Sequence, residues 1–169
     1  DFGDKNNFGV KQMKGWIGGI AMVAGIDQIS KALALAFLKP VGSMTVLPGV
    51  FDLTFVENRG AAFGMLQGQR WLFLALTVVV TVAVIYYVKK TKLDWRQNRL
   101  LSLSLVLLMG GAWGNAIDRL FRGYVVDYFE ITLFVYPVFN VADIGVVAGA
   151  IGIAIALLFF QKNGEERHG

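Results

Sequence analysis

Two aspartates, Asp127 and Asp143, are well suited to acid–base chemistry, because neither has a basic residue at helical spacing. Two carboxylates that lie close together cannot both ionise easily, so the pKa of one rises and that of the other falls. Such a pair holds one proton and titrates as a unit. Its ionised member can take a proton from water, and its protonated member can donate a hydrogen bond to a substrate carbonyl. This is the chemistry of aspartic peptidases.

The two aspartates need not have the same role. We expect Asp143 to be the base and Asp127 the acid at the start of the cycle, because a helix N-terminus favours negative charge on Asp143. The opposite assignment remains open. The residues alone also allow these acids to cap helices or to line an ion path.

Four long apolar stretches must position these aspartates. They run over residues 16–38, 71–88, 100–117 and 138–160. Of the 169 residues, 56% are hydrophobic and 17% are charged, whereas soluble domains average about 25% charged residues. About 20 helical residues cross a bilayer core, so we predict four transmembrane helices in a single membrane domain, residues 1–169. A very apolar soluble bundle is the weaker alternative, because an uncharged stretch such as 100–117 leaves a helix no polar face.

The third and fourth helices are expected to bring the aspartates together. If the third helix continues to Phe121, one of its faces carries Asn115, Asp118, Arg119 and Arg122. In the fourth stretch Asn140 suits an N-cap, which places Asp143 in the first turn. Consecutive antiparallel helices meet at their outer ends, so Asp127 and Asp143 can converge. Glycines at 110, 114, 145 and 149 would let these two helices approach closely.

Other charges within the apolar stretches are expected to be paired. A charge at mid-membrane costs about 2.5–3.5 kcal/mol. Asp27 and Lys31 are four residues apart on the first helix and can neutralise each other. For this pair a packing or folding role is favoured over a place near the substrate. Asp118 with Arg119 and Arg122 is similarly predicted to form a local ion pair that shapes the site.

The segment between the first two helices is expected to form a small sheet on the outer membrane surface. Phe51, Leu53 and Phe55 alternate with polar residues, which is typical of a strand. The Pro-Gly pair at 48–49 marks a turn, and residues 45–47 can supply a partner strand. The predicted fold is an all-α polytopic membrane protein with an extracytoplasmic β-sheet cradle at about 43–58. Residues 61–66 could form a short interfacial helix.

The basic residues predict the orientation in the membrane. Ten Lys and Arg lie beside the helix ends that adjoin the chain termini and the 89–99 loop. Five lie beside the opposite helix ends. By the positive-inside rule both termini are cytoplasmic, and the aspartates lie near the outer surface. No basic stripe with interleaved aromatic residues is present, so no nucleic acid is expected as a partner. Residues 1–12 are expected to be a non-native extension, since Met13 would make a natural start.

Five short motifs carry a resemblance to a known family. They are 27–31 (DQISK), 57–64 (ENRGAAFG), 114–119 (GNAIDR), 123–128 (GYVVDY) and 139–143 (FNVAD). Each is weak alone, but five in this order on four apolar stretches are specific. The chain resembles lipoprotein signal peptidase, also called signal peptidase II, over about residues 16–160.

The resemblance implies an aspartic endopeptidase of the bacterial inner membrane, without metal or cofactor. Its substrate would be a prolipoprotein carrying a diacylglyceryl group on the lipobox cysteine, cut just before that cysteine. The catalytic pair would be Asp127 and Asp143. Residues that line or support the site would be Asn58, Gly60, Asn115, Asp118, Arg119, Asn140, Asp27 and Lys31. The chain would contact membrane lipid, be inhibited by globomycin and act as a monomer.

Two rival hypotheses use the same residues. The first is a metal-dependent enzyme with Asp118, Asp127, Asp143 and two asparagines as oxygen ligands of a hard cation. The second is a small transporter or channel in which the acids form a proton or ion path. The lack of an internal repeat in the four predicted spans makes the second less favoured.

Overall fold

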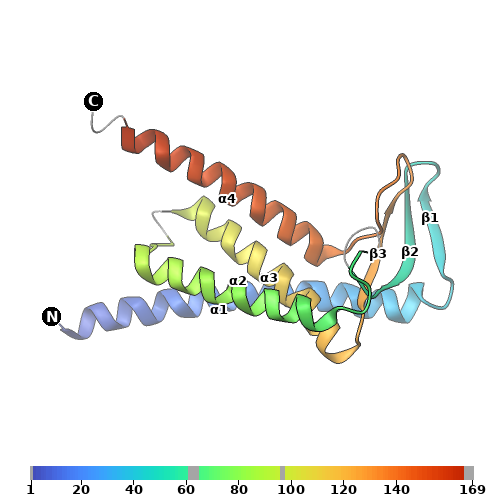
Figure 1. Ribbon diagram of the computed structural model, residues 1–169, viewed down its shortest axis with the longest axis horizontal. Helices are drawn as coiled ribbons and strands as arrows, with labels where there is room; N and C mark the ends of the chain where they lie inside the picture. Colours follow the sequence, from blue (N-terminus) through green and yellow to red (C-terminus); the bar gives the residue numbers. More distant parts are fainter. Residues whose placement is uncertain (1, 61–64, 96–97, 166–169) are drawn as a thin grey trace.

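The structure, a computed structural model, describes residues 2–60, 65–95 and 98–165, with side chains for 13–60, 65–95 and 98–158. Its elements run along the chain in the order of Figure 1. They are α1 (Phe2–Leu33), the π-helix η1 (Ala34–Leu38), β1 (Ser43–Leu47), β2 (Phe51–Asn58), α2 (Arg70–Thr91), α3 (Arg99–Phe121), β3 (Val125–Ile131) and α4 (Val141–Glu165).

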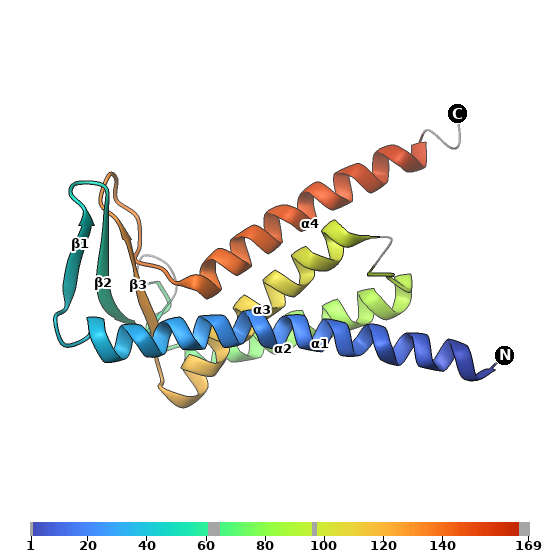
Figure 2. The same cartoon turned by 180° about the vertical axis from the view of Figure 1, so that it is seen from behind.

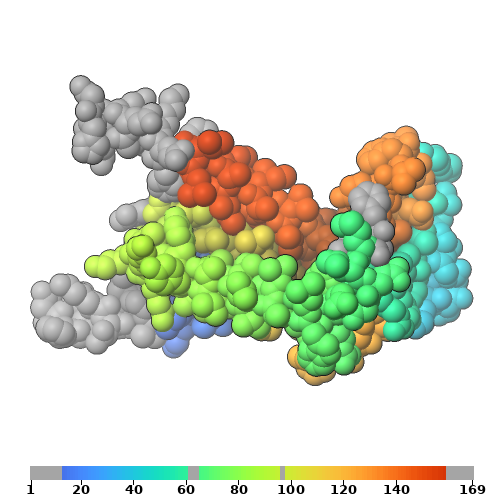
Figure 3. Space-filling model, viewed as in Figure 1, coloured from blue at the N-terminus to red at the C-terminus, as the bar shows by residue number. Residues whose placement is uncertain are grey.

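Four of these helices are long and apolar enough to cross a membrane. The candidate spans are Met13–Leu38, Arg70–Thr91, Arg99–Phe121 and Val141–Leu158. Helix α3 is the central one, since it buries residues from Leu101 to Asp118, whereas none of the residues of α2, all of them described, is buried. Figure 3 shows α3 largely covered by α2 and α4 in that view.

Glycines allow the close packing around α3, but not all in the predicted way. A Cβ at Gly149 of α4 would lie 2.6 Å from the Ser104 carbonyl oxygen of α3, which fits the expected approach of the two helices. A Cβ at Gly110 would instead lie 2.5 Å from Val23, and one at Gly114 would lie 2.5 Å from Asp27. These two glycines of α3 therefore pack against α1.

The sheet has three strands in the order β1-β2-β3, and both pairs are antiparallel. The predicted hairpin is present, with Met44 opposite Leu53 and the turn at Pro48-Gly49 between the strands. Placing the whole cradle at 43–58 was wrong, because β3 comes from the connection between α3 and α4. The backbone of this segment pairs with the edge of β2 that β1 leaves free. This pairing joins the sheet to the end of α3 and the start of α4.

Several helix ends differ from the prediction, since α1 begins at Phe2 rather than at 16, α2 ends at Thr91 rather than at 88, and α4 ends at Glu165 rather than at 160. The fourth helix begins at Val141 rather than at 138. Phe139 instead forms a β-bridge to Phe129, which draws the preceding residues out of the helix. The last turn of the first span widens into η1, where Lys39 N–H donates to the Ala34 carbonyl at 2.8 Å. The predicted short helix at 61–66 falls mostly outside the described residues, and Met65 and Leu66 lie in a turn.

The molecule has two unlike ends (Figures 1 and 2). The sheet stands across one end of the helices. The N-terminus, the C-terminal end of α4 and the ends of α2 and α3 that face their connection lie at the opposite end. This arrangement places β3 beside the start of α4.

Candidate active site

Asp127 lies on β3 with only 2% of its surface exposed, and two amide side chains hold its carboxylate. Its Oδ1 accepts a hydrogen bond from Asn140 Nδ2 at 2.6 Å, and its Oδ2 accepts one from Asn58 Nδ2 at 2.8 Å. Asn58 ends strand β2, whose pairing with β3 delivers it to this position.

Asp143 lies half-buried in the first turn of α4. Its backbone N–H donates to Asn140 Oδ1 at 3.0 Å, and its Oδ2 accepts from the Asn140 backbone N–H at 3.1 Å. This reciprocal arrangement corresponds to a capping box, so the predicted N-cap is confirmed. The other oxygen, Oδ1, accepts a hydrogen bond from Asn115 Nδ2 of α3 at 2.8 Å.

Asn140 joins the two aspartates. Its side-chain amide group donates to Asp127, while its backbone N–H and its Oδ1 both bond to Asp143. Asn140 is fully buried, so it has no water to replace these partners. The two carboxylates therefore lie on either side of one buried residue, which is the convergence that the antiparallel helices predict.

The environment of Asp127 favours its protonated form. Burial, together with the nearby Asp143 carboxylate, raises the pKa of Asp127 to about 7. The hydrogen bonds from Asn58 and Asn140 stabilise the ionised form and oppose this shift in pKa. Asp127 can therefore hold a proton near neutral pH.

Asp27 and Lys31 form a fully buried ion pair behind the aspartates. Lys31 Nζ lies 2.8 Å from Asp27 Oδ2 and donates to Asn115 Oδ1 at 2.8 Å. The second contact turns the donor end of the Asn115 amide toward Asp143. Asp27 Oδ1 accepts from the backbone N–H of Ala142 at 2.9 Å and so holds the start of α4.

Asp118 is fully buried and closes this network. Its Oδ2 lies 3.1 Å from Lys31 Nζ and accepts the backbone N–H of Val126 at 3.0 Å, which fixes the start of β3. Its Oδ1 accepts hydrogen bonds from Arg122 and Gln28. The predicted ion pair with Arg122 is present.

The local ion pair is formed by Asp118 and Arg122, and Arg119 is not part of it. The next residue along a helix points about 100° away, so Arg119 faces α2 and the end of β2. Its guanidinium lies 4.4 Å from the ring centre of Phe73 and donates to the Gly60 carbonyl at 3.2 Å. Gly60 N–H donates in turn to Asn58 Oδ1 at 2.9 Å. Arg119 thus holds Gly60, and Gly60 orients the Asn58 amide toward Asp127.

Gln28 belongs to the site, although the sequence analysis assigns it no role. Its Nε2 donates to Asp118 Oδ1 and to the Gly114 carbonyl, both at 3.0 Å, and its Oε1 accepts from Arg122 at 3.0 Å. An amide beside Asp27 in an otherwise apolar helix is the signal that could have identified it.

The structure thus brings eight of the ten predicted site residues into one hydrogen-bonded network around Asp127 and Asp143, which are the other two. Within the described part of the chain, no group of three or more His, Cys, Asp or Glu side chains is placed to hold a metal ion. A buried carboxylic acid beside a more exposed carboxylate, both fixed by amides, can exchange one proton with water and with a bound carbonyl.

Comparison with known proteins identifies the family. The sequence pattern of the family described as signal peptidase (SPase) II matches residues 19–159. A lipoprotein signal peptidase of Clostridioides difficile is 41% identical over 143 residues, which are 85% of this chain and 94% of that protein. One from Caldanaerobacter subterraneus subsp. tengcongensis is 45% identical over 140 residues, covering 83% of this chain and 93% of the relative.

A solved structure agrees with this similarity. It is titled as a bacterial membrane enzyme determined by the in meso method at 2.3 Å resolution, and it matches with a TM-score of 0.77 at 33% identity. The match covers 89% of this chain and 91% of the other. The chain therefore belongs to the signal peptidase II family, which consists of bacterial membrane aspartic peptidases.

Proposed function

We propose that this chain cleaves signal peptides from lipoprotein precursors, with Asp127 and Asp143 as its catalytic pair. The observation that carries the proposal is the bonding of both carboxylates to one buried residue, Asn140. This brings a protonatable aspartate and a more exposed one together at the sheet end of the bundle. The family membership supports the substrate class.

In the proposed cycle Asp143 is the base and Asp127 the acid. The raised pKa of Asp127 supports a proton there at rest, and the first turn of α4 supports charge on Asp143. Asp143 takes a proton from a water molecule, and the oxygen of that water attacks the scissile carbonyl carbon. At the same time Asp127 donates its proton to the carbonyl oxygen. Proton transfer to the leaving nitrogen then releases the two products.

The remaining predicted site residues are proposed to hold this pair. Asn58, Asn115 and Asn140 orient the carboxylates, and Arg119 fixes Gly60 and Asn58 from the other side. The network of Asp27, Lys31 and Asp118 anchors Asn115 and the starts of β3 and α4. These residues position the catalytic pair and need not touch the substrate.

The proposed substrate is a prolipoprotein with a diacylglyceryl group on its lipobox cysteine, cut just before that cysteine. A signal peptide is itself a membrane helix. Its cleavage point therefore reaches the level at which α3 ends and α4 begins. An extended peptide could pair with the sheet by strand addition. The resemblance to signal peptidase II also supports inhibition by globomycin. The proposal takes the chain to act as a monomer.

The proposed orientation has both termini in the cytoplasm and the sheet outside. The structure places the termini at the end opposite the sheet (Figure 1). Ten Lys and Arg flank the terminal end, which the positive-inside rule assigns to the cytoplasm.

The direct test is cleavage of a diacylglyceryl-modified lipobox peptide by purified protein in detergent with EDTA present. We expect a cut before the modified cysteine and no cut in the same peptide without lipid. Loss of cleavage in EDTA would instead support the metal-dependent rival. Absence of cleavage together with ion flux in proteoliposomes would support the transporter.

A further inference from the structure

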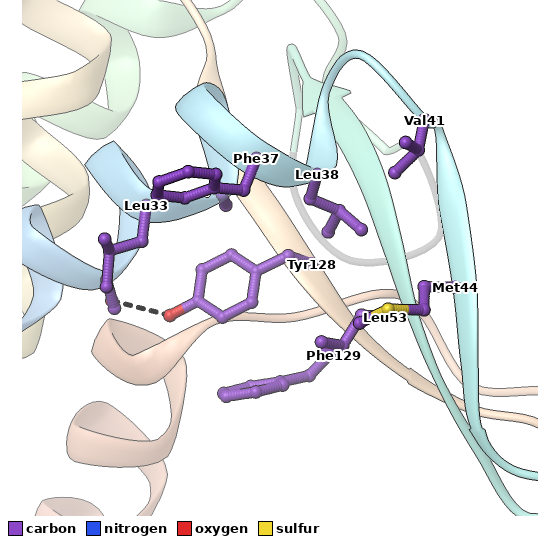
Figure 4. A pocket seen from close by; sticks show the side chains of 10 residues that line it. Leu33, Phe37, Leu38, Val41, Met44, Leu53, Tyr128 and Phe129 are labelled. Atoms are coloured by element: carbon purple, nitrogen blue, oxygen red, sulfur yellow. Dashed lines mark hydrogen bonds between the residues drawn. The ribbon is translucent and has the colours of Figure 1, made fainter.

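An apolar pocket of about 500 Å³ lies between the end of the first span and the sheet. Figure 4 shows its side chains converging from both elements. The lining from the first span and the turn after η1 comprises Ser30, Leu33, Ala34, Phe37, Leu38 and Val41. The lining from the sheet comprises Met44, Leu53, Tyr128 and Phe129. This volume is that of a small-molecule site.

The pocket is separate from the catalytic pair. Asp127 contacts Asn58 and Asn140, whereas Tyr128 points toward α1, where its hydroxyl lies 2.6 Å from Ser30 Oγ. Neither aspartate is among the residues that line the pocket.

The π-helix η1 shapes this pocket. Three of its five residues, Ala34, Phe37 and Leu38, line it. A π-helical turn is rare, and in many proteins it marks a functional site. Here the wider turn lies where the first span faces the sheet, and its residues form one wall of the pocket.

The position of the pocket determines what can fill it. Two of its lining residues, Leu33 and Phe37, belong to the membrane span Met13–Leu38 and are 54% and 73% exposed. Surfaces of a spanning helix at this level face lipid chains. Residues 32–38 and 40–51 contain no charge, and the hydroxyls of Tyr128 and Ser30 bond to each other. An apolar cavity of this kind offers water no partners.

We propose that this pocket holds one fatty acyl chain of a bilayer phospholipid. The chain would enter from the membrane between Leu33 and Phe37 and lie against Met44, Leu53 and Tyr128. It would supply the van der Waals contacts that the pocket walls lack and so couple the sheet to the first helix. The site is distinct from the proposed substrate site and does not depend on the peptidase activity.

Photo-crosslinking tests this proposal. The photoreactive residue p-benzoylphenylalanine is placed at Met44, which lines the pocket, and at Thr45, the neighbouring residue on the opposite side of β1. Each protein is reconstituted in phosphatidylglycerol vesicles and irradiated, and its mass is then measured by intact-protein mass spectrometry. We expect one added phosphatidylglycerol at position 44 and none at position 45. No adduct at position 44, or equal adducts at both, would overturn the proposal.

Two matched tryptophan variants and a competitor complete the test. Leu33→Trp fills the pocket and should abolish the adduct at position 44, whereas Ile29→Trp, one turn earlier on the same exposed face, should leave it. Gel filtration first shows that each variant is folded. Retention of the adduct in a folded Leu33→Trp protein would contradict the proposal. Loss of the adduct upon saturation with a diacylglyceryl-modified lipobox peptide would assign the pocket to the substrate lipid and also overturn it.

Discussion

At the scale of single residues, Asn140 has two separable tasks. Its Oδ1 caps the backbone N–H of Asp143, while its Nδ2 donates to the Asp127 carboxylate. A serine can perform the first task but not the second, because it is a good N-cap with a short side chain that cannot donate from the Nδ2 position. Substitutions at this residue therefore distinguish helix stability from catalysis.

Asn140→Ser should retain most of the stability of the wild type but lose peptidase activity. Removing a donor so that a buried acceptor is left unsatisfied costs about 1–3 kcal/mol, which corresponds to a fall of roughly fivefold to a hundredfold in kcat/KM. Asn140→Ala should lose activity and also unfold at lower temperature. Full activity in the serine variant would show that Nδ2 does not position Asp127.

The raised pKa of Asp127 predicts how activity depends on pH. Asp127 must be protonated at the start of the cycle, so kcat/KM should fall as the pH rises through about 7. Asn58→Ala removes a donor that stabilises the carboxylate, so the pKa of Asp127 should rise further and the basic limb should move to higher pH. A pH profile of cleavage for both proteins measures this shift. A limb that stays in place or moves to lower pH would contradict it.

The same pKa has a consequence for stability. A carboxyl whose pKa is higher in the folded protein binds more protons when folded, so stability should fall as the pH rises from about 4 to 7. Asp127→Asn removes this titration. The variant should therefore show a smaller loss of Tm over this range than the wild type, in thermal unfolding in detergent. Equal slopes would show that Asp127 does not titrate there.

At the scale of elements, Lys31 holds together the starts of β3 and α4 through its buried partners. Lys31→Met leaves Asp27 and Asp118 buried without their shared cation, which costs about 3–5 kcal/mol. The matched control is Lys39→Met, whose pair with Glu57 is exposed and should matter little. Thermal unfolding in detergent should show a large fall in Tm for the first variant only.

The sequence predicts the helices better than the contacts between them. The length of the apolar stretches predicts four spans, and Asn140 as an N-cap predicts that Asp143 lies in the first turn of α4, because both signals are local. The third strand was missed, because Val125–Ile131 becomes a strand by pairing with β2, some 70 residues earlier in the chain. The direction of Arg119 and the partners of Gly110 depend on which helix lies beside α3, which spacing along one helix does not specify.

At the scale of the whole molecule, the sheet and the termini lie at opposite ends, so the proposed orientation is testable by labelling. The chain contains no cysteine, so single cysteines can be introduced as reporters. Val135 is 92% exposed beside the sheet, and Lys90 is exposed at the far end of α2. In cells with a permeabilised outer envelope and an intact inner membrane, an impermeant maleimide should label Val135→Cys but not Lys90→Cys. Labelling of Lys90→Cys but not of Val135→Cys would show that the orientation is opposite to the proposed one.

The central claim is that Asp127 and Asp143 together perform the hydrolysis, and their replacement by asparagine tests it most directly. The measurement is cleavage of the diacylglyceryl-modified lipobox peptide by the wild type, Asp127→Asn and Asp143→Asn. Asp52→Asn is the matched control, since Asp52 lies on β2 of the same sheet but outside the network. We predict that both site variants fold, as shown by gel filtration, and lose cleavage, while the control cleaves as the wild type does. Continued cleavage with asparagine at either site position would contradict the account and make Asp118 the next residue to replace.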